Sequence, residues 1–133
     1  MKQSDWTLPL FEVSVSQCFS VAVTRVSKVL IGRARPTIFL KKGVYGFHGL
    51  EWDRQYHSFP SGHTLTAFTL ATSFTYLFPK FRNLFYSLAT LLSLSRTVLF
   101  DHYLSDLIAT AAVGMTIAGF VHIITRRIHD ETS

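Results

Sequence analysis

The chain has 133 residues, of which 48% are hydrophobic and only 16% are charged. Soluble domains carry about 25% charged residues, so this composition argues against a soluble domain and favours a membrane protein. The net charge of +5 would suit a nucleic-acid partner, but the basic residues collect between apolar segments and form no stripe, which argues against that class. With Cys18 as the lone cysteine, no internal disulfide forms, and no Cys/His cluster has zinc-site spacing.

Four apolar segments predict an all-α membrane bundle that forms a single domain over residues 1–133. The first segment covers about residues 10–31. Its β-branched residues would also permit a strand, but about 20 residues without a turn signal favour a helix. Gly32 loosens the end of this helix and Pro36 prevents its continuation. A long loop is expected over residues 37–59, either as an ordinary exposed cap of the bundle or as a functional loop.

The remaining apolar segments cover about residues 61–78, 83–98 and 102–125. The stretch from Leu107 to Thr125 contains no Asp, Glu, Lys or Arg. As a helix it would span about 28 Å, close to the hydrocarbon thickness of a bilayer. Segments 61–78 and 83–98 are near the short limit for crossing, and either alone would also suit a buried helix of a soluble protein. Taken together, the segments predict about four membrane spans with basic residues at their ends.

Three short polar runs, residues 28–36, 60–63 and 95–106, contain the ionisable residues that stand out against this apolar background. The first run ends one apolar segment and the second begins the next, while the third joins the last two segments. If the four segments cross the membrane in turn, all of these ends lie at the same face. Ionisable residues beside apolar spans are costly to desolvate, so the pattern predicts a single functional site at one membrane surface.

The first two runs are suited to binding an anion. Lys28 and Arg35 are separated by about two helical turns, so both cations lie on one face. The run 60–63 opens a helix, where free amide N–H groups and the positive end of the dipole attract phosphate. Gly62 allows close approach of the backbone to an oxyanion, and Arg96 of the third run adds a planar cation.

The third run also contains a candidate nucleophile. His102 and Asp106 are four residues apart, so on a helix the carboxylate accepts the imidazole N–H. That hydrogen bond fixes the tautomer and raises the basicity of the other nitrogen, as a nucleophile requires. Each run taken alone is more often structural, because such residues also serve as snorkelling anchors, helix caps or structural hydrogen bonds.

Together, the three runs resemble the tripartite signature of the type 2 phosphatidic acid phosphatase (PAP2) superfamily. That signature reads Lys-x6-Arg-Pro, then Pro-Ser-Gly-His, then Ser-Arg-x5-His-x3-Asp. The resemblance covers residues 28–106, with the last apolar segment completing the core of the fold. All eleven defining residues are present: Lys28, Arg35, Pro36, Pro60, Ser61, Gly62, His63, Ser95, Arg96, His102 and Asp106.

The resemblance implies a role for each residue of the site. His102 would attack phosphorus and form a phosphohistidine, with Asp106 orienting it, and His63 would protonate the leaving oxygen. No metal or cofactor is expected, because cations supply the charge stabilisation that magnesium gives elsewhere. The phosphoryl oxygens would be held by Lys28, Arg35, Ser61, Gly62 and Arg96.

The implied function is that of a membrane phosphatase acting on a lipid phosphate or diphosphate monoester. The partners would be that substrate and the surrounding membrane lipids, and no nucleic acid. Bacterial membrane members of the family imply a place in the inner membrane, with the motif face and loop 37–59 turned outward to the periplasm. The cytoplasmic face would be marked by Lys2, Lys80, Arg82, Arg126 and Arg127.

The number of segments departs from the family. Its membrane members usually have six spans and this chain offers about four, so the first two spans are expected to be missing. The main alternative is therefore a truncated, non-catalytic bundle or partner subunit. A vanadate-dependent haloperoxidase shares the same motifs, but that group is soluble and much larger than this chain.

Overall fold

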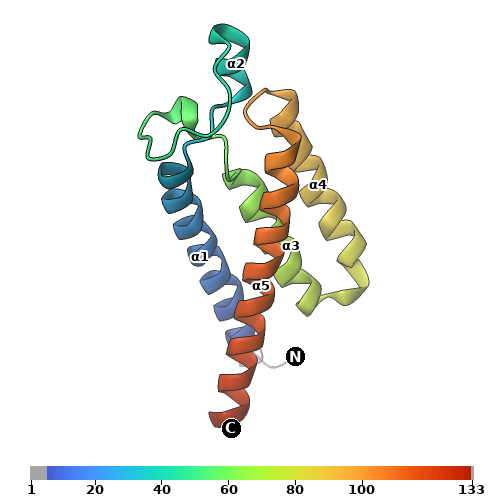
Figure 1. Ribbon diagram of the computed structural model, residues 1–133. Coiled ribbons are helices and arrows are strands. Elements are labelled where there is room, and N and C mark those ends of the chain that lie inside the picture. Colours follow the sequence, from blue (N-terminus) through green and yellow to red (C-terminus); the bar gives the residue numbers. More distant parts are fainter. Residues whose placement is uncertain (1–5, 133) are drawn as a thin grey trace.

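The computed structural model describes residues 6–132, and over this range the chain is helical with no β-strand. Four long helices run side by side, and the short helix α2 stands beyond one end of them (Figure 1). The predicted all-α bundle is confirmed, while Lys2 lies outside the described residues. The elements are α1 (Thr7–Ile31), α2 (Pro36–Lys42), η2 (Arg54–Tyr56), α3 (Gly62–Leu77), η3 (Pro79–Phe81), α4 (Arg82–Val98) and α5 (Leu104–Thr132).

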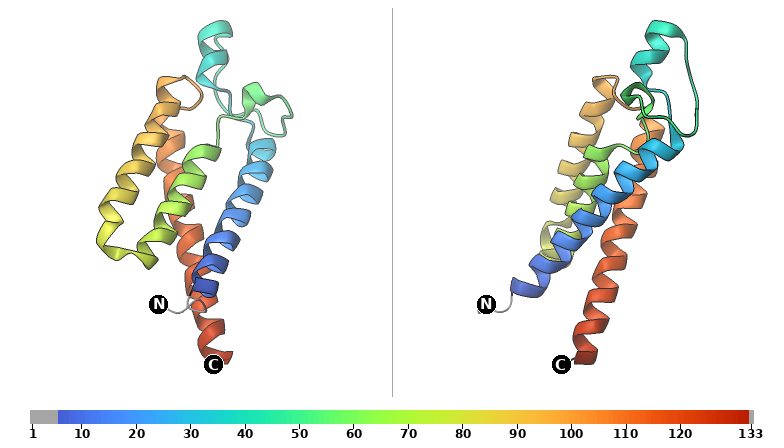
Figure 2. Two further views of the ribbon diagram at one scale, coloured as in Figure 1. Left: turned by 180° about the vertical axis from the view of Figure 1, so that it is seen from behind. Right: turned by 90° about the vertical axis from the view of Figure 1, so that its left-hand side faces the viewer.

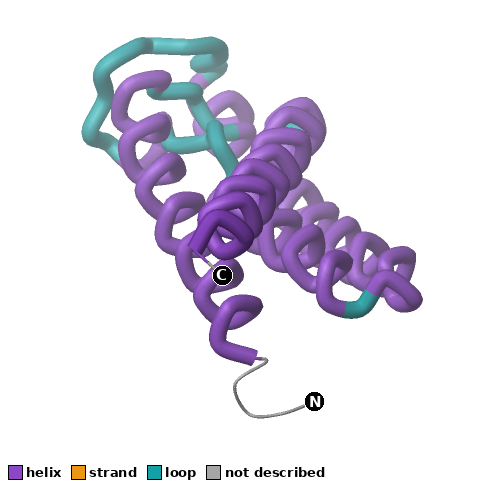
Figure 3. The backbone as a smooth tube through the Cα atoms, turned by 90° about the horizontal axis from the view of Figure 1, so that it is seen from below, coloured by secondary structure: helices purple, strands orange, loops and turns teal. Residues whose placement is uncertain are grey.

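Helix α3 occupies the middle of the bundle and packs against α1, α4 and α5. Opposite views place α1 and α4 on either side of α3 (Figures 1 and 2), and the view from below keeps α1 and α4 apart (Figure 3). Helix α5 covers one face of α3. The opposite face, between α1 and α4, carries no other helix from residues 6–132 (Figure 2).

Many large apolar side chains lie on the surface of the bundle, where a soluble domain would carry mostly polar ones. Large hydrophobic residues are exposed along α1, α4 and α5, for example Phe19 at 51%, Leu91 at 66% and Ile108 at 66%. Small and hydroxyl-bearing residues form much of the buried interior, including Ser16, Ser20, Thr64, Thr69, Thr72, Ser93 and Thr110. Small residues let helices approach closely, and an apolar outer face suits contact with lipid tails.

Two of the four long helices have the length and hydropathy of a membrane span. They are α1, with 25 residues, and α5, with 29 residues. Helices α3 and α4 have 16 and 17 residues. At that length they rise only about 24 and 26 Å, which is short of the roughly 30 Å hydrocarbon core. All four predicted helices are therefore present, but the described chain contains two candidate spans where the sequence predicted about four.

The chain leaves α1 through a glycine that no other residue can replace without rearrangement. Gly32 has a φ of 56°, and its N–H donates to the carbonyl of Lys28 at 3.2 Å, which closes the helix. A Cβ on Gly32 would lie 2.1 Å from the carbonyl oxygen of Gly49. The turn therefore brings the start of the long connection back against the end of α1.

Two predicted boundaries are wrong. Residues 37–59 were expected to be a loop, but α2 begins at Pro36 and continues to Lys42. Proline ends a helix that precedes it, yet it is favoured at the first position of a new one, because its missing N–H and fixed φ cost nothing there. The last helix was expected to start near His102, whereas α5 begins at Leu104. His102 therefore lies in the connection between α4 and α5.

An ionic cluster around the buried Glu12 ties α1 to α5 at the end of the bundle opposite α2. The carboxylate of Glu12 is 2.9 Å from Nδ1 of His122 and 3.3 Å from Nε of Arg126. The ring of Tyr76, from α3, stacks on His122 with their centroids 3.9 Å apart. These contacts join three helices, so they fix the spacing of the bundle below the site.

We expect Gly114→Ala to destabilise the bundle where α3 and α5 cross. A Cβ on Gly114 would lie 3.0 Å from the carbonyl oxygen of Leu65 and 3.1 Å from the amide nitrogen of Thr69. Because both contacts are backbone atoms, the helices must separate, at a cost of about 1–3 kcal/mol. Thermal unfolding in detergent micelles measures the loss. Gly119→Ala is the control, since its Cβ would meet the hydroxyl of Tyr76 at 3.4 Å; equal losses in both variants would contradict the prediction.

Candidate active site

The structure brings the three polar runs together at one end of the bundle. The end of α1, the start of α3 and the connection between α4 and α5 all lie at the end nearest α2 (Figure 1). Long-range contacts join the runs: Arg35 pairs with Asp101, and His102 contacts Ser58. Within the described residues the three runs therefore meet at one end of the bundle, and their action as one functional site remains a prediction.

His102 is buried, with 3% of its surface exposed, and its Nδ1 lies 2.5 Å from the carbonyl oxygen of Ser58. A carbonyl oxygen only accepts hydrogen bonds, so Nδ1 carries the proton and donates it. The lone pair of the neutral ring is then on Nε2, which leaves that nitrogen available to attack. A backbone carbonyl thus fixes the tautomer that a nucleophilic histidine needs.

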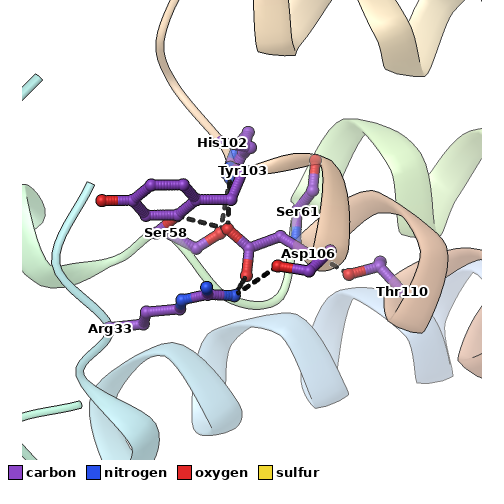
Figure 4. A network of polar contacts seen from close by, with 8 residues as sticks. Arg33, Ser58, Ser61, His102, Tyr103, Asp106 and Thr110 are labelled. Atoms are coloured by element: carbon purple, nitrogen blue, oxygen red, sulfur yellow. Dashed lines mark hydrogen bonds and ion pairs between the residues drawn. The ribbon is translucent and has the colours of Figure 1, made fainter. Parts of the chain in front are cut away.

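Asp106 does not accept the imidazole N–H of His102, so the predicted direct hydrogen bond between them is wrong. The two residues do not share a helix, because α5 begins between them. Instead the carboxylate of Asp106 accepts from Oγ of Ser58 at 2.5 Å and from the backbone N–H of Tyr103 at 3.0 Å, and pairs closely with Arg33 (Figure 4). Asp106 therefore acts on His102 through Ser58.

Arg33 is a residue of the candidate site that the sequence pattern did not reveal. It is 8% exposed, its guanidinium pairs with the fully buried Asp106, and it lies 4.6 Å from the ring centre of Tyr103 and 5.2 Å from that of Phe47. Burial raises the pKa of the Tyr103 phenol, so this ring stays neutral beside the cation. A basic residue between Lys28 and Arg35 was the available signal, but a buried arginine and an exposed one look alike in a sequence.

Ser58 was also missed, because its most important contact is made by its backbone. Its carbonyl accepts from His102, its hydroxyl donates to Asp106, and its N–H donates to the carbonyl of Arg33 at 2.9 Å. Its position two residues before Pro60 holds it beside the start of α3. Three contacts therefore hold Ser58 between the ion pair and the imidazole.

Arg35 and Arg96 share a carboxylate beside the candidate nucleophile. Nη1 of Arg35 is 3.2 Å from Asp101, and Nη2 of Arg96 is 3.8 Å from the same carboxylate. Asp101 immediately precedes His102 in the chain. The carboxylate of Asp101 therefore lies between the two arginines, where it occupies the position of an anion next to His102 in the chain.

A cavity of about 910 Å³ adjoins these residues on the face of α3 between α1 and α4. Lys28, Arg35, Gly62 and His63 line its polar part, together with residues of the η2 turn. Its apolar part is lined by Val21, Val29, Ala67, Leu70 and Leu92. The cavity thus joins a cationic region to a hydrophobic groove that follows the helices.

Four predicted site residues do not line this cavity: Ser61, Arg96, His102 and Asp106. Ser61 is fully buried, and its hydroxyl accepts from the N–H of Thr64 at 3.4 Å as the N-cap of α3. Its own N–H donates to the hydroxyl of Thr110 at 3.2 Å (Figure 4). Ser61 therefore anchors α3 to α5, and a direct contact between its hydroxyl and phosphate remains a prediction.

The surroundings of His102 keep it neutral. Burial lowers its pKa from 6.5 to about 4, the hydrogen bond to Ser58 opposes that shift, and the positive charges of Arg35 and Lys28 reinforce it. An uncharged imidazole is required for attack on phosphorus, since protonation removes the lone pair. Burial and cationic neighbours together therefore maintain the reactive form at neutral pH.

We expect the His102 imidazole to titrate with a midpoint near pH 4. Because its folded-state pKa lies below the ordinary value of 6.5, the neutral form dominates at pH 7 and is lost as pH falls through about 4. Carbon-13 NMR of histidine-labelled protein in micelles measures the midpoint, with the resonance assigned by its absence in His102→Gln. A midpoint at pH 6 or above would show that burial does not control this ring.

Within residues 6–132, no group of three His, Cys, Asp or Glu side chains is placed to hold a metal ion. The anion-binding groups around the cavity are instead Lys28, Arg35 and the amide groups at the start of α3. Catalysis without a metal remains a prediction from the sequence.

Comparisons with known proteins agree with the motif geometry. The profile of the PAP2 superfamily matches residues 9–130. Lipid A 1-phosphatases of Rhizobium etli and Rhizobium johnstonii are each 38% identical over 96 residues, which is 72% of this chain. The matched part is 41% and 39% of the length of those relatives, and no solved structure matches. The chain belongs to the PAP2 superfamily.

Proposed function

We propose that this chain is a lipid phosphatase that hydrolyses a phosphate monoester, with His102 as the nucleophile. The observation that carries the proposal is the cavity lined by Lys28, Arg35 and His63, whose cationic part continues into an apolar groove along α1, α3 and α4. A lipid phosphate has the same two parts, an anionic head and a hydrophobic tail. Its phosphate would meet Lys28 and Arg35 while its tail follows the groove.

The proposed reaction has two steps. Nε2 of His102 attacks phosphorus, the bond from phosphorus to the lipid oxygen breaks, and His63 donates a proton to that oxygen. Water then gives a proton to His63 and attacks the phosphohistidine, and the phosphorus–nitrogen bond breaks, which releases inorganic phosphate and restores both histidines. Arg35, Arg96 and Lys28 stabilise the negative charge on the transferring group, which is the part a metal ion has in other phosphatases.

The phosphate must replace Asp101 between the two arginines. In the structure the carboxylate of Asp101 lies 3.2 Å from Arg35 and 3.8 Å from Arg96. A phosphate monoester with about two negative charges competes well for bidentate arginine, because it offers more charge and more acceptor oxygens than a carboxylate. The resulting pose brings phosphorus to the residue that follows Asp101, which is His102.

Lipid A 1-phosphate is the first substrate to test, because the two relatives are lipid A 1-phosphatases. The proposed location is the bacterial inner membrane with the site facing the periplasm. This facing is proposed from the family resemblance, because basic residues lie at both ends of the bundle: Arg33, Arg35, Lys41, Lys42 and Arg54 are at the site end, and four more are at the opposite end. Those four are Lys80, Arg82, Arg126 and Arg127.

The test is phosphate release by the purified full chain in phosphatidylcholine vesicles containing EDTA. Lipid A 1-phosphate, phosphatidic acid and a prenyl diphosphate are offered separately, and we expect turnover of at least one of them that EDTA does not reduce. If none is turned over by correctly folded protein, the non-catalytic bundle is the better description. If EDTA stops turnover, the metal-independent mechanism is wrong.

A further inference from the structure

Two arginines outside the motifs line the same cavity as Lys28 and His63. They are Arg25, on α1, and Arg54, on the η2 turn. No Asp or Glu is among the residues that line the cavity. Neither arginine forms an ion pair with any residue in the described range 6–132. Both arginines are exposed, so the open side of the cavity carries two solvated cations without an ion-pair partner in the described chain.

The position of Arg25 is determined by the helix that carries it. Arg25 precedes Lys28 by one turn of α1, and Val21 lies one further turn along the same wall of the cavity. The rise between Arg25 and Lys28 is about 4.5 Å. Arg25 thus lies between the cation assigned to the reacting phosphate and the start of the apolar groove.

The position of Arg54 is fixed by hydrogen bonds of the η2 turn. The backbone N–H of Arg35 donates to the carbonyl of Gln55 at 2.9 Å, and the carboxylate of Asp53 accepts from the N–H of Gln55 at 3.0 Å. At the end of the turn, His57 contacts the carbonyl of Glu51 at 2.9 Å. The turn is thereby held to the motif backbone just beyond the end of α1, and Arg54 lines the cavity from there.

The charge in the cavity exceeds that of one phosphate. A phosphate monoester carries about two negative charges, and Lys28, Arg35 and Arg96 already supply three positive charges to it. Only Asp101 offsets them, through its pairs with Arg35 and Arg96. Arg25 and Arg54 therefore add two positive charges beyond those assigned to the first phosphate, which is enough to neutralise the inner phosphate of a diphosphate, with its single ionisable oxygen.

We propose that Arg25 and Arg54 form a second anion subsite that binds a second phosphate group on the same lipid molecule. The inference rests on the proposed function and narrows its substrate to lipids with two phosphates, of which a lipid diphosphate is the most direct. In such a substrate His102 attacks the terminal phosphorus and the bridging P–O bond breaks. The lipid monophosphate is the leaving group, and it takes a proton on the former bridging oxygen. Its phosphate is held between Arg25 and Arg54 until this product dissociates.

The experiment compares the monophosphate and the diphosphate of one prenyl alcohol, so that the tail is constant. Wild type, Arg25→Gln and Arg54→Gln are assayed as full chains in phosphatidylcholine vesicles. Loss of a charge-assisted contact should raise KM for the diphosphate about tenfold, and at least five times more than for the monophosphate. Arg127→Gln, at the far end of α5, is the matched control for loss of one positive charge. Equal changes for both substrates, or no change for the diphosphate, would overturn the subsite.

A binding measurement separates this inference from the proposed function. Calorimetry with methylenediphosphonate and with methylphosphonate needs no turnover, because neither compound is hydrolysed. We expect Arg25→Gln and Arg54→Gln to weaken diphosphonate binding about tenfold and methylphosphonate binding much less. If wild type hydrolyses no lipid phosphate but shows this difference, the function fails and the subsite stands. If the variants bind diphosphonate as wild type does, the subsite is wrong whatever the activity.

The second phosphate could instead belong to a neighbouring lipid, and the vesicle composition distinguishes the two sources. The monophosphate assay is repeated with phosphatidylglycerol in the vesicles. A subsite for the same molecule predicts that the ratio of mutant to wild-type KM stays as it was in phosphatidylcholine. If the two variants impair monophosphate turnover only when phosphatidylglycerol is present, the arginines bind a neighbouring head group and the proposal is overturned.

Discussion

Replacing His102 by alanine should reduce phosphate release from lipid phosphates by a factor of about 10⁴ or more. The substitution removes the nitrogen that attacks phosphorus, and the neighbouring His63 is assigned to protonating the leaving oxygen. The substitution leaves intact the cavity that is lined by Lys28, Gly62 and His63. Substrate should therefore still bind, and the loss should appear in kcat with little change in the dissociation constant.

Two measurements together test this result. Steady-state phosphate release gives the size of the loss, and rapid quenching with phosphorus-32 substrate detects a phosphoprotein that is labile in acid and stable in base. Wild type should show the labelled intermediate and His102→Ala should not. His48→Ala is the matched control, because His48 is an exposed histidine of the outer connection. Turnover of His102→Ala close to wild type would remove this residue from the reaction.

The second large effect is expected at the buried pair of Asp106 and Arg33. Asp106→Ala leaves the Arg33 guanidinium buried at 8% exposure without its counter-charge. Breaking a buried pair in this way costs about 3–5 kcal/mol of unfolding free energy. It also removes the acceptor for the Ser58 hydroxyl, so the carbonyl that orients His102 is no longer held. We therefore expect kcat to fall about 10²-fold even in protein that remains folded.

A double variant separates stability from positioning. Arg33→Met combined with Asp106→Leu removes both charges, so most of the lost stability should return, as it does when buried pairs are replaced by apolar groups. Activity should stay low, because Ser58 still lacks its carboxylate partner. Thermal unfolding and kcat are measured for Arg33→Met, for Asp106→Leu and for the double variant. Asp130→Ala, at an exposed position on α5, is the control. Full activity in the double variant would rule out positioning through Ser58.

Much of the fold could be predicted because it depends on local patterns. Long apolar runs without turn signals predicted the four long helices, and alternate crossing predicted that the polar runs meet at one end. Lengths were less predictable: α3 and α4 have 16 and 17 residues, and whether such helices cross a bilayer or pack within the bundle depends on their neighbours. The start of α2 at Pro36 was missed because proline both ends and begins helices.

In the candidate site, too, local sequence patterns predicted some features, while others depend on contacts between distant segments. The motif residues identified which side chains to examine, but their contacts differ from the predicted ones. His102 and Asp106 are close in sequence and would pair directly only if both were helical, and the observed connection excludes that. Their actual partner, Ser58, is 44 positions from His102 and 48 from Asp106. A contact made by a backbone carbonyl across that separation leaves no pattern of residue types.

The sequence by itself determined the helical class, the family and the residues of the three motifs, because apolar periodicity and side-chain chemistry are properties of the chain alone. Only the tertiary structure decided which imidazole nitrogen is free, that Arg33 is the partner of Asp106, and that Arg25 and Arg54 reach the cavity of Lys28. Those features depend on burial and on contacts between distant segments. Arg33 and Asp106 are 73 positions apart, and only packing of the helices places one charge against the other.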